Sequence, residues 1–125
     1  MTEIHTDWIK TVSLSPPTLQ DNTADADRLK SALSNQLGLE SVDIDFSILK
    51  SLPDLLRKCD FNVRCILIHI DNRWVVTKVV PADDPEPVAV LAIDLGTTRI
   101  SLRLVNLLSG DSINEISLLN PQVSV

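Results

Sequence analysis

The most informative stretch of the chain covers Val88–Gln122 and reads VAVLAIDLGTTRISLRLVNLLSGDSINEISLLNPQ. Within it, an apolar run ends at Asp94, and a second strand-like run begins at Ile100 after only a few residues. Two apolar runs joined by a short segment that contains glycine are typical of a β-hairpin. We therefore predict a strand, a tight turn at Gly96-Thr97-Thr98 and a returning strand.

The predicted turn contains residue types that hold a phosphate group. Gly96 permits a positive φ and a close approach of the backbone, and Thr97 and Thr98 supply backbone N–H groups and hydroxyls. Asp94, at the end of the first strand, is placed to hold a metal-bound water. The sequence therefore indicates a candidate nucleotide-binding turn. The alternative is that the same residues form only a hairpin turn in an unrelated sheet.

The pentapeptide Asp94-Leu95-Gly96-Thr97-Thr98 resembles the first phosphate motif of the actin, Hsp70 and sugar-kinase (ASKHA) superfamily. The flanking residues are similar to one branch of it, the ATP-dependent reductive activators of corrinoid proteins. The residues that carry this second resemblance are Pro16-Pro17, Asp27-Arg28-Leu29, Ala32-Leu33, Leu49, Leu52-Pro53, Leu56-Arg57, Ser109-Gly110-Asp111 and Leu119-Asn120-Pro121-Gln122. The resemblance to the activators therefore spans nearly the whole chain.

This resemblance implies a function for the parent protein. Such activators join a ferredoxin-like [2Fe–2S] domain to an ATPase domain. They use ATP and Mg²⁺ to drive electron transfer to the cobalt of a corrinoid (cobalamin) protein in a methyltransferase system. By the same resemblance, Asp94 orients a Mg²⁺-bound water, and Gly96, Thr97 and Thr98 contact phosphate. Arg99 departs from the small or polar residue expected after the threonines, and we assign it no role.

The resemblance also predicts that the chain is a fragment, because the second phosphate hairpin, the adenosine pocket and the cysteine-rich domain are all missing from it. We expect residues 1–84 to be a linker module. Residues 85–125 are expected to be the incomplete N-terminal strands of the ASKHA domain, without catalysis of their own. Two alternatives stay open: a small binding domain with no nucleotide site, and the start of a sugar or acetate kinase. The module over Pro16–Arg57 argues against the kinase.

The fold class expected is α+β, with two helices on a short antiparallel sheet followed by an antiparallel three-stranded segment from an actin/Hsp70-like, RNase H-like domain. Helical periodicity runs from Thr23 to a stop at Gly38, with Asn22 or Thr23 as the cap. A second helix is expected over Leu52–Lys58. Strands are expected over residues 7–14, 61–70 and 74–80, and a brief strand or a loop over residues 39–44. The second and third of these strands flank Asp71-Asn72-Arg73, a short turn that predicts a hairpin.

The segment PADDPEP, residues 81–87, is predicted to be a semi-rigid linker because three of its seven residues are proline. The apolar positions upstream of it predict a small core. The expected core residues are Trp8, Leu29, Leu33, Leu37, Leu52, Leu55, Leu56, Ile66 and Ile68.

Composition limits the partners. The chain has 125 residues, a net charge of −6 and no tyrosine, which disfavours nucleic acid and anionic membranes as partners. No apolar run is long enough to span a bilayer, and the N-terminus does not resemble a signal peptide, so we expect a cytoplasmic protein. A homodimer is expected if the strands after Val88 lack their usual partners.

The remaining candidates for chemistry are two cysteines and two histidines. Cys59 and Cys65 are too few for a zinc or [2Fe–2S] site, so no metal ligands are expected in this chain. Both are read as partly buried free thiols, at a helix end and on a strand. His69 is read as an outward position on a strand, because no acid and nucleophile accompany it. His5 is given no role.

Overall fold

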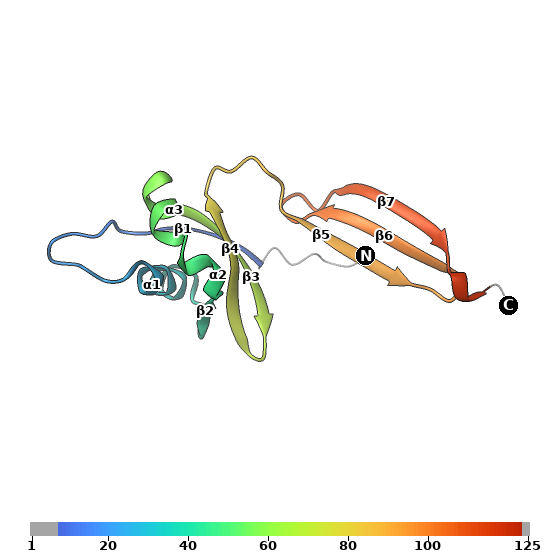
Figure 1. Ribbon diagram of the computed structural model, residues 1–125, viewed down its shortest axis with the longest axis horizontal. Coiled ribbons are helices and arrows are strands. Elements are labelled where there is room, and N and C mark those ends of the chain that lie inside the picture. The colour runs from blue at the N-terminus through green and yellow to red at the C-terminus, as the bar shows by residue number, and fades with distance from the viewer. Residues whose placement is uncertain (1–7, 124–125) are drawn as a thin grey trace. The chain divides into compact units, whose positions relative to one another are not determined.

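The computed structural model of the chain describes residues 8–123. These residues form two compact units, which divide between Asp84 and Pro85. Figure 1 shows helices together with strands in the first unit and only strands and a short 3-10 helix in the second. The predicted α+β class is confirmed. Asp7 and His5 lie outside the described residues.

The first unit is built from four strands and three helices. Its sheet has the order β1-β3-β4-β2. The elements are β1 (Ile9–Ser13), α1 (Asp25–Leu37), β2 (Val42–Ile44), α2 (Phe46–Leu49), α3 (Leu52–Lys58), β3 (Asn62–Ile70) and β4 (Arg73–Pro81).

Helix α1 ends as predicted but begins differently. Gly38 has φ of 66° and its N–H donates to the Ser34 carbonyl, which is the expected left-handed stop. The residue before the helix is Ala24, which makes no side-chain cap. The cap predicted at Asn22 or Thr23 is therefore wrong. Its physical reason is local competition, because the Thr23 hydroxyl donates to the Asp21 carboxylate instead.

The two short helices follow each other closely. Asp45 caps α2, because its carboxylate accepts a hydrogen bond from the Ser47 backbone N–H at 3.0 Å. Helix α3 covers the residues expected, Leu52–Lys58, with proline in its first turn. Ser51 does not act as a side-chain cap, since its hydroxyl donates to the Ile48 carbonyl at 3.3 Å.

Strands β3 and β4 form the predicted hairpin. Asp71 and Asn72 have φ of 50° and 64°, so the two turn residues adopt the left-handed conformation that suits the twist of a hairpin. His69 is exposed on β3, and its ring centroid lies 4.8 Å from that of Trp74, opposite it on β4. This arrangement fits the reading of His69 as a strand position rather than a base.

One edge of the sheet differs from expectation. The expected sheet is antiparallel, and β1–β3 and β3–β4 are, but β2 pairs with β4 in parallel. β2 contacts β4 only at Trp74–Val76, so the far end of β4 is an edge. Pro81 therefore belongs to β4, opposite Val63, although the sequence placed it in the linker. A proline without an N–H is tolerated on an unpaired edge.

The core of the first unit lies between the helices and one face of the sheet. Leu29, Leu33, Leu52 and Leu56 are buried as predicted. Ile66 and Ile68 were wrongly expected there, because alternate residues of β3 face opposite sides. Trp8 is 40% exposed, and Leu37 and Leu55 are half-buried. The inward sheet residues are Val12, Val63, Cys65, Leu67 and Val76.

The second unit is an antiparallel sheet of three strands in the order β5-β6-β7. These strands are β5 (Ala89–Leu95), β6 (Arg99–Asn106) and β7 (Ser112–Leu119), and a 3-10 helix follows at Pro121–Val123. Cross-strand register places one set of apolar side chains together, which we call the apolar face. It consists of Leu91, Ile93, Leu95, Ile100, Leu102, Leu104, Ile116 and Leu118. Within residues 8–123, no helix has the length and apolar character required to cross a membrane.

Candidate functional site

The candidate phosphate turn lies between β5 and β6. Leu95 pairs with Ile100, so Gly96, Thr97 and Thr98 lie in the connection. The predicted hairpin is therefore present. Asp94 lies one residue before Leu95, opposite Ser101, and so points to the face of the sheet that is opposite the apolar face.

Gly96 is required at its position for a different reason from the one the sequence suggested. The described glycines with positive φ are Gly38 and Gly110, so the positive φ expected at Gly96 is wrong. A Cβ atom at Gly96 would instead lie 2.6 Å from the carbonyl oxygen of Arg99. This distance is a steric overlap with backbone. Close backbone approach, the second property expected of this glycine, is therefore what the turn uses.

The two threonines of the turn are accessible. Thr97 and Thr98 are both exposed, and over residues 8–123 neither hydroxyl takes part in a hydrogen bond. Both hydroxyls are therefore available to a ligand. An exposed pair of hydroxyls beside a glycine can donate to phosphate oxygens.

Asn120 connects the end of β7 to this turn. Its side-chain Nδ2 donates to the Gly96 carbonyl at 3.0 Å, and its backbone N–H donates to the Thr98 carbonyl at 2.8 Å. Its Oδ1 accepts from the Gln122 backbone N–H at 3.0 Å. In the sequence, Asn120 carries only part of a family resemblance and has no predicted place in the site. The pairing of β6 with β7 is the feature that brings it there.

An open depression of about 770 Å³ lies beside the turn. Gly96 and Thr97 line it, whereas Asp94 and Thr98 do not. The residues that line it are Leu95, Gly96, Thr97, Ile100, Asn120, Pro121 and Gln122. The structure thus brings two of the four predicted site residues together with the Asn120-Pro121-Gln122 segment.

The residues present fit a nucleotide-bound magnesium ion better than a protein-held metal. Asp94 is an exposed carboxylate, and the described residues contain no group of three histidine, cysteine or acidic side chains placed to bind a metal. Mg²⁺ usually keeps several waters and takes one or two carboxylates together with substrate phosphates. A single carboxylate near a phosphate turn is consistent with that pattern.

The residues present do not fit an iron–sulfur cluster. Cys59 and Cys65 are both free, and a [2Fe–2S] cluster takes about four ligands. Cys65 is buried on β3, and burial raises the pKa of its thiol to about 12. Cys59 is half-buried at the end of α3, where its thiol contacts the Leu55 carbonyl at 3.0 Å. The two cysteines lie at a helix end and on a strand, as predicted. The partial burial expected of both is wrong for Cys65, which is fully buried because it faces the core of the first unit.

Arg99, left without a role by the sequence, contacts the neighbouring strand. Its Nη1 donates to the Ser117 hydroxyl of β7 at 3.3 Å, and its side chain is exposed. Arg99 is therefore a cross-strand hydrogen-bond partner of Ser117.

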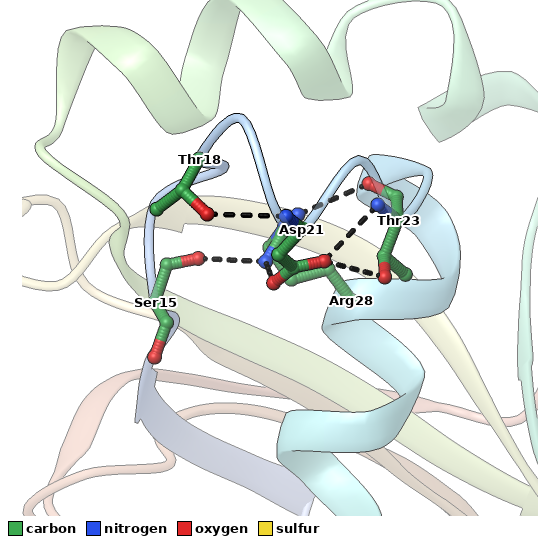
Figure 2. Close-up of polar contacts among 5 residues, drawn as sticks. All are labelled: Ser15, Thr18, Asp21, Thr23 and Arg28. Atoms are coloured by element: carbon green, nitrogen blue, oxygen red, sulfur yellow. Dashed lines mark hydrogen bonds and ion pairs between the residues drawn. The ribbon is translucent and has the colours of Figure 1, made fainter.

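A second polar cluster lies in the first unit around Arg28 (Figure 2). The Arg28 side chain is 7% exposed, and its Nη1 donates to the Ser15 carbonyl at 3.0 Å and to the Asp21 carboxylate at 2.8 Å. Its Nη2 donates to the Thr23 carbonyl at 3.1 Å. The hydrogen bond from Arg28, followed by those from Thr23, holds the pKa of the Asp21 carboxyl well below its usual range. Because both terminal nitrogens of Arg28 donate to the loop before α1, the cluster is structural.

Comparisons with known proteins agree with the resemblance. The family model described as RACo linker region matches residues 8–99, and the one described as RACo middle region matches residues 89–125. A solved structure named "Reductive activator for corrinoid,iron-sulfur protein" is similar, with 28% identity and a TM-score of 0.78. The match covers 93% of this chain and 18% of that one. No curated protein sequence matches significantly.

Proposed function

The chain belongs to the RACo linker region family, and we propose that it is a segment of an ATP-dependent iron–sulfur activator. The activator reductively reactivates a corrinoid protein of a methyltransferase system. Residues 1–84 are its linker module, and residues 85–125 are the first strands of its ASKHA nucleotide-binding domain. This chain covers 18% of the similar activator. Catalysis therefore belongs to the whole protein, and this segment alone is non-catalytic.

The observation that carries the nucleotide part of the proposal is the exposed turn beside an open depression. Thr97 lines the depression with Gly96, and its hydroxyl is available. Thr98, the next residue, presents a second exposed hydroxyl. These groups contact the phosphate oxygens of ATP, and the Asp94 carboxylate accepts hydrogen bonds from the water shell of the nucleotide's Mg²⁺.

The remaining parts of the activity lie outside this segment. The ligands of the [2Fe–2S] cluster come from the electron-transfer domain of the parent, because this chain has only Cys59 and Cys65. The corrinoid protein is the partner that receives the electron. A cytoplasmic location fits two free thiols, since a reducing compartment keeps cysteines unpaired.

The apolar face of the second unit supports self-association of this segment. Ile93 is 57% exposed and Leu95 is 75% exposed, although both lie among other apolar side chains. A contiguous exposed apolar surface favours contact with another protein surface. We propose that the segment in isolation forms a homodimer through this face.

Two other functions fit the observations less well. A small binding domain with no nucleotide site would explain the hairpin, but it would not explain the family match over residues 8–99. A sugar or acetate kinase usually begins at its phosphate strand, whereas here an α+β unit precedes β5.

The nucleotide proposal is tested in the parent protein by binding of Mg-ATP, measured by calorimetry. Thr97→Ala is expected to weaken binding by about tenfold, the usual effect of losing one hydrogen bond to a charged group. Thr11→Ala is the matched control, because Thr11 is also an exposed threonine but lies in the first unit. Equal affinities for the parent and Thr97→Ala would overturn the assignment of the turn.

The non-catalytic character of the segment is tested separately. The purified 125-residue chain is incubated with Mg-ATP, and phosphate release is measured. We expect none above background. Hydrolysis that disappears in the Thr97→Ala variant would show that the segment is catalytic by itself.

A further inference from the structure

The residue that directly follows the third strand of the second unit holds both ends of the phosphate turn. Asn120 donates from its side chain to the Gly96 carbonyl at 3.0 Å and from its backbone to the Thr98 carbonyl at 2.8 Å. The turn is therefore fixed from β7 as well as by its own hairpin. Arg99, which follows the turn, pairs with Leu119, which precedes Asn120. This register places Asn120 beside the turn.

These contacts have an electrostatic consequence for an anion. A carbonyl oxygen carries partial negative charge and repels phosphate unless a donor occupies it. Asn120 occupies the carbonyls of Gly96 and Thr98, while the hydroxyls of Thr97 and Thr98 stay available. The turn thus presents the Thr97 hydroxyl to the adjacent depression and the Thr98 hydroxyl to solvent, while two of its carbonyl acceptors are engaged by Asn120.

Steric fit makes the turn sensitive to this contact. Gly96 packs so closely that an added Cβ atom would lie 2.6 Å from the Arg99 carbonyl oxygen. A change in the orientation of the Gly96 peptide would therefore also change the close approach between Gly96 and the Arg99 carbonyl. Asn120 is itself held, because its Oδ1 accepts from the Gln122 N–H. A flip of the side-chain amide would exchange Nδ2 and Oδ1 and would break both the bond to the Gly96 carbonyl and the bond from the Gln122 N–H.

We propose that Asn120 is a positioning residue for phosphate binding, acting through the Gly96–Thr98 turn. The inference rests on the proposed function, because it assigns a role within the same nucleotide site. It goes beyond that function by placing a determinant of ATP affinity at the end of β7. Asn120 acts on the geometry of the donors in the turn.

The test uses Asn120→Ala and Asn120→Asp. Alanine removes the side-chain donor without adding charge. Aspartate keeps the shape and the acceptor for Gln122, but an ionised carboxylate has no proton to donate to Gly96. Both variants keep the backbone N–H that binds the Thr98 carbonyl. Asn114→Ala is the matched control, because Asn114 is an asparagine of β7 whose side chain, among residues 8–123, accepts a hydrogen bond only from the backbone N–H of its neighbour Glu115.

The first readout is independent of ATP. Amide chemical shifts of Gly96, Thr97 and Thr98 are measured by NMR in the 125-residue chain. Both Asn120 variants are expected to shift these resonances while leaving those of the first unit unchanged, and Asn114→Ala is expected to leave the turn unchanged. Unmoved turn resonances in both variants would overturn the positioning role.

The second readout is ligand affinity in the parent protein. Both variants are expected to bind ATP about tenfold more weakly, in line with one lost hydrogen bond, and adenosine as before. A general loss of structure would weaken both ligands equally and would count against the inference. If the unmodified parent binds no ATP, the proposed function fails and takes this inference with it. If the parent binds ATP but neither variant differs from it, the inference alone is overturned.

Discussion

Arg28 Nη1 lies 2.8 Å from Asp21 Oδ2, and this ion pair joins helix α1 to the loop that precedes it. The guanidinium is buried, whereas the carboxylate is 43% exposed. Arg28 also holds the carbonyls of Ser15 and Thr23, so one side chain fixes both ends of the loop. The loop lacks regular structure, and its position depends on this arginine.

The first prediction concerns acid stability. The hydrogen bond from Arg28 lowers the pKa of Asp21 in the folded state. The ionised carboxylate therefore stabilises the fold above the unfolded pKa of about 3.9, and this stabilisation is lost as the pH falls towards the lower folded pKa. Urea unfolding across this range should show a smaller acid loss for Asp21→Asn than for the unmodified chain. Equal losses would contradict this role.

The second prediction concerns the core of the first unit. Leu56 is fully buried, so Leu56→Ala should reduce the free energy of unfolding by about 2–5 kcal/mol. Leu19 is fully exposed, and Leu19→Ala should change it by no more than about 0.5 kcal/mol. Chemical denaturation followed by tryptophan fluorescence measures both. A similar effect for the two variants would argue against the observed core.

The third prediction concerns the exit from the first unit. Arg64 donates to the carbonyls of Ala82 and Asp84 at 2.9 Å and 3.2 Å, and these contacts hold the chain up to the unit boundary. Arg64→Met should therefore make the segment after Pro81 easier to cleave by a protease. Arg73→Met is the control, because Arg73 forms an exposed ion pair elsewhere. Unchanged cleavage of the Arg64 variant would show that these hydrogen bonds do not hold the segment.

The fourth prediction concerns thiol reactivity. Cys65 is buried and its pKa is raised to about 12, so its thiolate is scarce and inaccessible in the folded state. Cys59 is half-buried and should react first with a thiol reagent near neutral pH. Mass spectrometry of the modified peptides should show Cys65 labelled only at the rate of unfolding. Labelling of both at one rate in the folded chain would contradict the burial.

The fifth prediction concerns association of the isolated segment. Ile93→Lys places a charge on the apolar face and should reduce the dimer fraction measured by light scattering. Ala92→Lys is the matched control, because Ala92 is the exposed neighbour on the opposite face of β5. A monomer at all concentrations for the unmodified chain would refute the dimer.

The sequence predicted elements well where local rules act. Gly38 ends α1 because a left-handed residue stops a helix, and Asp71-Asn72 fits the two-residue hairpin turn. The prediction failed where a side chain has two possible hydrogen-bond partners close to it in the sequence. The Thr23 hydroxyl donates to Asp21 instead of capping α1, and the sequence is compatible with both arrangements. Such competition is decided by the loop, which Arg28 positions.

Tertiary pairing explains the other differences. Ile66 and Cys65 are both apolar residues of β3, and only the position of the helices decides that Cys65 faces the core. In the candidate site, the hairpin around Gly96 was predictable because its residues are neighbours in sequence. The contact from Asn120 was not, because it depends on how β7 pairs with β6. A motif in the sequence does not reveal the register in which two strands pair.

The strand order β1-β3-β4-β2 also sets when the first unit can assemble during synthesis. β1 leaves the ribosome long before its partner β3, and β2 waits in the same way for β4, which ends at Pro81. Until that residue has left the ribosome, the nascent chain carries unpaired strand edges and uncovered leucines, which are features that favour aggregation.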